Sequence, residues 1–121
     1  MKKFYLSLLL LLLTIWASAQ FSGGLGTVAS PYQVASVSDL GNIRNYPGSC
    51  FIQTQDIDLS AISNWEPIGG GGTSGKFTGQ YNGNGKIISN LTISKPSISD
   101  IGLFGHIGEG SASAPVVIRD V

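Results

Sequence analysis

The chain has 121 residues and a formal net charge of zero; 17 residues are glycine, and 12% are charged. This glycine-rich, charge-poor composition favours one small domain of short strands and tight turns over a helical or disordered chain, because isoleucine, leucine, valine and aromatic residues recur throughout. There is no basic patch with interleaved aromatic residues, which excludes nucleic acid as a partner.

The first 19 residues have the features of a secretory signal peptide. Lys2 and Lys3 precede a leucine run at Leu8–Leu13, and Ala17-Ser18-Ala19 fits a signal-peptidase site. The apolar stretch is shorter than the about 20 residues of a spanning helix, although a retained membrane anchor stays the alternative. We predict cleavage after Ala19, a secreted or cell-surface location, and no membrane insertion once the signal is removed. Cleavage leaves five basic and seven acidic residues, a net charge of −2.

Residues 20–49 are predicted to form an N-terminal cap with one short helix. Ser36 and Asp39 resemble a capping box, and Val37, Leu40 and Ile43 then recur every three residues on one helical face. Proline and glycine at positions 47 and 48 end this pattern.

The single cysteine, Cys50, cannot form an intrachain disulfide. Its neighbours Ser49, Phe51 and Ile52 favour a small buried hydrophobic side chain over a reactive thiol. The domain must therefore be stabilised by its core, by repetition, or by parts of the protein beyond this sequence.

Residues 50–121 have the character of strands and turns, with a repeated motif. Asp56-Ile57-Asp58-Leu59 matches Asn90-Leu91-Thr92-Ile93 at a spacing of 34, and Asp120-Val121 begins a third copy 30 residues later. Asn and Asp tolerate the left-handed backbone of sharp turns, and Asn82–Gly85 is predicted to be such a turn. The pattern predicts parallel stacked turns with loops of variable length, and an ordinary antiparallel sandwich is the alternative.

Seven segments in this order resemble bacterial surface proteins that carry GLUG motifs. They are Gly24–Thr27 with Pro31–Val34 and Asp39-Leu40, D-I-D-L at Asp56–Leu59, W-x-P-I-G at Trp65–Gly69, the glycine-rich motif Phe77–Gly85, I-S-N-L-x-I at Ile88–Ile93, G-L-F-G at Gly102–Gly105, and the closing Ile118–Val121.

This resemblance implies an all-β fold, a right-handed parallel β-helix (solenoid) with a short N-terminal capping helix, and residues 50–121 would be its first coils. It also implies an extracellular, adhesin-like or stalk-like role without catalytic residues. Only one G-L-F-G is present where such proteins hold several, so we expect a fragment truncated at its C-terminus. Related stretches precede the catalytic part of some secreted peptidases. The alternative is therefore an N-terminal appendage of a glycan-degrading or peptidase enzyme whose catalytic part lies beyond Val121.

Two segments could bind a ligand. Gly70–Phe77 approaches a phosphate-binding loop but has Phe77 where a hydroxyl should coordinate magnesium, which favours a plain glycine loop. Asp56 and Asp58 would lie on one face of a strand, a pattern that suits calcium or acid–base catalysis. The matching positions Asn90 and Thr92 carry no carboxylate, so solvated or turn-stabilising aspartates are the favoured interpretation.

Structural roles are the favoured prediction for the remaining residues that could bind a ligand. His106 is the only histidine and belongs to no zinc or hydrolase motif. Trp65, Tyr81 and Phe104 could stack on sugar if exposed, but core packing is the favoured prediction. Asn90-Leu91-Thr92 matches the N-glycosylation sequon, which we discount in a repeat core of bacterial character.

The sequence therefore predicts no catalytic residue, no cofactor-binding residue and no metal ligand, and it predicts a non-enzymatic module. The expected partner is an extracellular protein or glycan that the sequence does not identify. Self-association through an open strand edge is also expected, because unpaired edges invite pairing with another chain.

Overall fold

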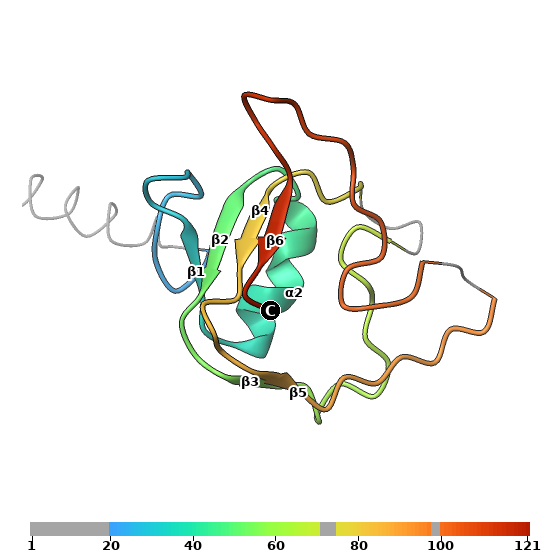
Figure 1. Ribbon diagram of the computed structural model, residues 1–121. Coiled ribbons are helices and arrows are strands. Elements are labelled where there is room, and N and C mark those ends of the chain that lie inside the picture. Colours follow the sequence, from blue (N-terminus) through green and yellow to red (C-terminus); the bar gives the residue numbers. More distant parts are fainter. Residues whose placement is uncertain (1–19, 71–74, 98–99) are drawn as a thin grey trace, which may run out of the picture.

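A computed structural model of the chain describes residues 20–70, 75–97 and 100–121 (Figure 1). The predicted signal peptide at residues 1–19 lies outside the described residues. Among the residues that the structure describes, no helix is long and apolar enough to cross a bilayer.

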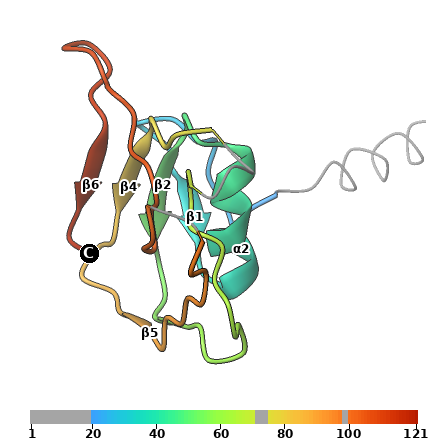
Figure 2. The ribbon, with the colours of Figure 1, turned by 90° about the vertical axis from the view of Figure 1, so that its right-hand side faces the viewer.

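Four short strands form the larger sheet: β1 (Tyr32–Val34), β2 (Cys50–Gln53), β4 (Gln80–Asn82) and β6 (Val117–Arg119). They lie side by side in the order β1-β2-β4-β6, and every neighbouring pair is parallel (Figure 2). Strands β3 (Ile57–Asp58) and β5 (Ile88–Ser89) form a second, two-stranded parallel sheet.

The one described α-helix, α2 (Val37–Asn42), continues into the 3₁₀ helix η1 (Ile43–Asn45), so the predicted helix is confirmed. The Ser36 side chain caps it by accepting a hydrogen bond from the Asp39 backbone N–H at 3.1 Å. The Asp39 carboxylate accepts from the Ala35 N–H at 3.0 Å and the Ser22 hydroxyl at 2.6 Å, which ties the segment before β1 to the helix.

A column of aromatic rings fills the core. The register aligns Tyr32, Phe51, Tyr81 and Ile118 on four successive strands, so their side chains lie on the same face of the sheet, and the Tyr32 and Phe51 ring centres are 5.8 Å apart. Phe77 lies 6.2 Å from the Phe51 ring centre, and both rings are buried. Helix residues Leu40 and Ile43 are fully buried in the same core.

The predicted all-β, right-handed parallel β-helix is wrong for this structure. The chain forms two separate sheets of short parallel strands and a helix that belongs to the core. Segment 50–121, predicted to be first coils, holds β2 to β6 joined by long irregular connections. Among the described residues these connections add two isolated bridges, Ile68 with Phe104 and Phe77 with Ile107. Prolines at 67, 96 and 115 lie in the connections, and proline cannot donate to a strand ladder.

The register of the repeated motif also differs from the prediction. Ile57 pairs with Ile88, whereas the motif alignment would pair it with Leu91. We expected the Asn or Asp of the motif to adopt the left-handed backbone of a sharp turn. This expectation is confirmed in part, because Asn90 and Asp120 have left-handed backbones with φ of 59° and 54°. The predicted tight turn is confirmed as well, with φ of 55° at Asn84 and 67° at Gly85.

Candidate functional site: polar bridges and an apolar surface

The two aspartates, for which the sequence favours a solvated or turn-stabilising role over calcium binding or catalysis, form hydrogen bonds across the two-stranded sheet. Asp56 Oδ1 accepts a hydrogen bond from the Ile87 N–H at 2.9 Å. Asp58 Oδ1 accepts from Asn90 Nδ2 at 2.8 Å and from the Ser60 N–H at 2.9 Å. These hydrogen bonds lower the pKa of the Asp58 carboxyl below its ordinary value because they stabilise the charged form, and the bond from Asn90 has the largest effect. Both carboxylates are exposed, and each already accepts at least one hydrogen bond.

Further side chains form bridges of the same kind. Asn64 bonds to the backbone of Ser94 twice, at 2.9 Å through its oxygen and at 3.1 Å through its nitrogen. Asn84 Nδ2 donates to the Gln53 carbonyl at 3.2 Å. These contacts, together with Asp56–Ile87 and Asp58–Asn90, join residues 30 to 32 positions apart in the chain. A regular offset of this size shows that polar side chains connect one parallel segment to the next.

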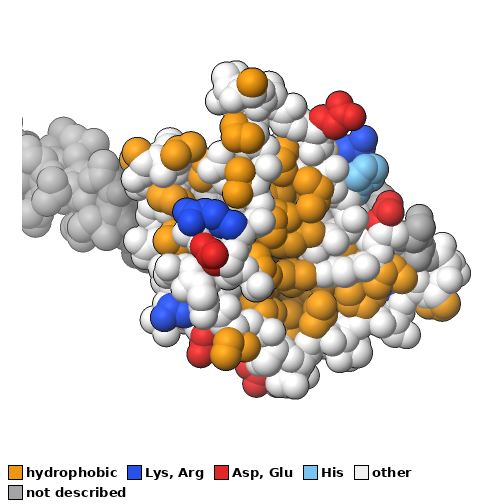
Figure 3. Space-filling model, in the orientation of Figure 1, with side chains coloured by type: hydrophobic (Ala, Val, Ile, Leu, Met, Phe, Trp, Pro, Cys, Tyr) orange, Lys and Arg blue, Asp and Glu red, His pale blue; other side chains and the backbone are white. Residues whose placement is uncertain are grey.

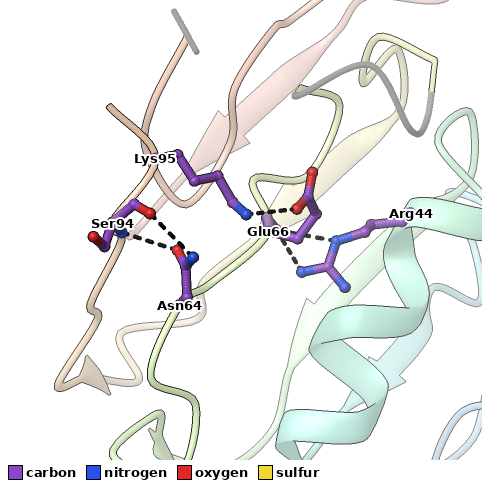
Figure 4. Close-up of polar contacts among 5 residues, drawn as sticks. All are labelled: Arg44, Asn64, Glu66, Ser94 and Lys95. Carbon is purple, nitrogen blue, oxygen red and sulfur yellow. Dashed lines mark hydrogen bonds and ion pairs between the residues drawn. The ribbon is translucent and has the colours of Figure 1, made fainter. Parts of the chain in front are cut away.

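Arg44 makes a connection that sequence reasoning missed (Figure 4). Its guanidinium lies 4.4 Å from the centre of the Trp65 ring and donates from Nε to the Glu66 carbonyl at 3.0 Å. Burial lowers the pKa of Arg44, and the nearby Glu66 carboxylate partly offsets this. Glu66 also pairs with Lys95 at 3.0 Å. Arg44 therefore links the 3₁₀ helix to the tryptophan motif.

The aromatic candidates for sugar stacking lie in or against the core. Trp65 is buried, and its Nε1 donates to the Leu103 carbonyl at 3.2 Å. Tyr81 is fully buried, and its hydroxyl donates to Gln53 Oε1 at 2.7 Å. Burial raises the pKa of Tyr81. Phe104 is half-buried and packs on Phe77 at 4.9 Å. No face of Trp65 or Tyr81 is free for a sugar ring.

The remaining candidates lie apart from one another. His106 is exposed, with Nδ1 3.9 Å from Asp100 Oδ2. Most of the Gly70–Phe77 loop, residues 71–74, lies outside the described residues. Over residues 20–70, 75–97 and 100–121, no group of three or more His, Cys, Asp or Glu side chains is placed to hold a metal ion.

Cys50 lies on the outer face of the larger sheet. It is half-buried, which raises the pKa of its thiol. It lines two small concavities of about 90 and 150 Å³, together with Val28 and Gln80. The prediction of a small buried side chain therefore holds only in part.

An apolar concavity of about 320 Å³ lies at the end of the structure that carries the C-terminus. Figure 3 shows hydrophobic side chains gathered on this face. Its lining residues are Lys86, Ile87, Ile88, Leu91, Leu103 and Val121. Three of them are large apolar side chains with high exposed fractions, 62% for Ile87, 41% for Leu91 and 69% for Val121.

No family model matches the chain, and no solved structure matches it. It is 42% identical over 99 residues to a protein of Evansella cellulosilytica named "Putative Gly-rich membrane protein", a match that covers 76% of this chain and 11% of that protein. It is 37% identical over 107 residues to halomucin of Haloquadratum walsbyi, a match that covers 80% of this chain and 1% of halomucin. The chain thus spans a small part of these relatives, whose names are compatible with a surface or secreted protein. The resemblance to GLUG-motif proteins stays a prediction.

Proposed function

We propose that the chain is a non-enzymatic extracellular module with a structural or adhesin-like role. One observation carries this proposal: the two aspartates that the sequence offers for chemistry are engaged in bridging neighbouring segments, and Asn64 forms a bridge of the same kind. Asp56, Asp58 and Asn64 all bond to residues about 30 positions away. Hydrogen bonds of this kind fix neighbouring segments relative to one another, which is a structural role.

The sequence relatives support a surface location for this module. The predicted signal peptide and the names of the two relatives agree on export to the membrane or beyond. In a second candidate function, the same module is the N-terminal appendage of a secreted glycan-degrading or peptidase enzyme. The small share of each relative that the chain covers favours a module within longer proteins, which suits both candidates.

An adhesion assay with an activity control tests the proposal. Beads coated with the secreted chain are expected to bind at least one extracellular polymer from a panel of polysaccharides and matrix proteins. The same polymers should release no sugar or peptide during incubation. Beads coated with heat-unfolded chain serve as the control. Turnover of any polymer would contradict the non-enzymatic assignment, and binding no stronger than that of the control would remove the adhesive role.

A further inference from the structure

Two asparagine–glycine pairs follow each other in the turn between β4 and β5. The pairs are Asn82-Gly83 and Asn84-Gly85. A hydrogen bond from the Lys86 N–H to the Gly83 carbonyl at 2.9 Å closes the turn. An asparagine before a glycine is prone to lose its side-chain amide, because glycine has no Cβ to shield its backbone nitrogen from that amide. Both pairs share this reactive dipeptide, so the fold decides which of them reacts first.

The first pair is held by its neighbours. Gly83 is buried, and its N–H donates to the Arg119 carbonyl at 2.8 Å. A Cβ at Gly83 would lie 2.2 Å from the carbonyl oxygen of Asp120, so the backbones are in close contact here. The Asn82 side chain is engaged as well, since its Oδ1 accepts from the Asn84 N–H at 2.9 Å. The Gly83 nitrogen must break its hydrogen bond before it can react, and this slows the reaction.

The second pair is open to solvent. Asn84 and Gly85 are both exposed, and a Cβ at Gly85 would meet no atom within 4 Å. Within the described part of the chain, the Gly85 N–H donates to no acceptor. Gly85 has a φ of 67° and no steric neighbour, so the backbone has room to bring its nitrogen to the amide carbon of Asn84. The Asn84 side chain itself makes one hydrogen bond, from Nδ2 to the Gln53 carbonyl at 3.2 Å.

We propose that Asn84 is a site of spontaneous deamidation. The Gly85 backbone nitrogen gives its proton to solvent hydroxide and bonds to Cγ of Asn84. The Cγ–Nδ2 bond then breaks, and the leaving amide takes a proton from water and departs as ammonia. Water opens the resulting succinimide ring at one of its two carbonyl carbons, which leaves aspartate or isoaspartate at position 84. The net reaction consumes one water and releases one ammonia, with no oxidation or reduction.

Either product removes a contact between two parallel segments. A carboxylate has no N–H to donate, so the hydrogen bond to the Gln53 carbonyl is lost and two oxygen atoms face each other. Isoaspartate also adds a methylene group to the backbone of the turn that Lys86 and Gly83 close. The module therefore contains a slow, irreversible loosening of the link between β2 and the turn after β4. This chemistry goes beyond the proposed function and does not depend on adhesion to any polymer.

Peptide mass spectrometry of the folded chain, incubated at mildly alkaline pH, tests the site. The expected result is conversion of amide to acid at Asn84 at least about fivefold faster than at Asn82, with labelling by an isoaspartate methyltransferase. In urea the two rates should become similar, because the Gly83 hydrogen bond is then lost. No conversion, equal rates in the folded chain, a faster reaction at Asn82, or a rate ratio that urea leaves unchanged would each overturn the proposal.

Two variants test the loosening that follows deamidation. Asn84→Asp reproduces the loss of the donor to Gln53 and is expected to lower the ratio of folded to unfolded chain about fivefold in urea unfolding. Asn82→Asp is the matched control, because its carboxylate can still accept from the Asn84 N–H, and this ratio should stay within about twofold of the wild type. Equal stability of the two variants would contradict the loosening.

Discussion

Replacing Phe51 with alanine is expected to lower the free energy of unfolding by about 3–5 kcal/mol. Phe51 is 1% exposed and lies in the middle of the aromatic column, with ring centres of Phe21 at 5.5 Å, Tyr32 at 5.8 Å and Phe77 at 6.2 Å. Rings from three segments lose contacts together, and the cavity cannot close without moving β2 and its neighbours. For a domain whose total stability is of the order of 5–15 kcal/mol, this loss approaches full unfolding.

Urea unfolding followed by tryptophan fluorescence measures this effect at a concentration where the chain is monomeric. Leu25→Ala is the control, because its side chain is largely exposed and its removal should change stability by less than about 0.5 kcal/mol. Equal stabilities of the two variants would show that the aromatic column does not form.

Replacing Gly79 with alanine is expected to have the second large effect, a loss of up to about 3 kcal/mol. A Cβ at this position would lie 1.9 Å from the carbonyl oxygen of Ser49, a backbone atom that cannot move aside cheaply. Gly79 begins the approach of β4 to β2, since the Gln80 N–H donates to that same carbonyl at 3.1 Å. The added methyl group therefore forces the two central strands of the larger sheet apart.

Gly75→Ala is the matched control for this substitution. A Cβ at Gly75 meets no atom within 4 Å, so alanine should be tolerated with a change below about 0.5 kcal/mol. Thermal unfolding of the two variants by circular dichroism compares them directly. A Gly79→Ala variant as stable as Gly75→Ala would contradict the close approach of β2 and β4.

Local features of the fold could be predicted from the sequence, because their causes lie within a few residues. The cap of α2 at Ser36 needs only a hydroxyl and a helix start next to it, and the turn at Asn84-Gly85 needs only residues that tolerate positive φ. The closing segment at Ile118–Val121 overlaps β6, but this strand pairs with β4 in the larger sheet, whereas the predicted repeat counterpart Ile88 lies in the smaller sheet.

Non-local features could not be predicted in the same way. The pairing of Ile57 with Ile88 depends on the path and length of the connection between the two strands. The residues of the repeated motif do not specify that length. The same limit explains the missed contact of Arg44 with Trp65, which are 21 positions apart and share no periodic pattern. The sequence favours structural roles for Asp56 and Asp58, but it does not predict their hydrogen-bond partners Ile87 and Asn90.

The central claim is that polar side chains serve to hold neighbouring segments together. The most direct test is the free energy of unfolding of Asn64→Ala against that of Asn45→Ala. Both side chains make exposed hydrogen bonds, but Asn64 bonds to Ser94 across 30 positions, whereas Asn45 bonds to Asn42 three positions away. We predict a loss of about 1–2 kcal/mol for Asn64→Ala, from two lost hydrogen bonds, and less than about 0.5 kcal/mol for Asn45→Ala. Equal and small losses in both variants would contradict the claim.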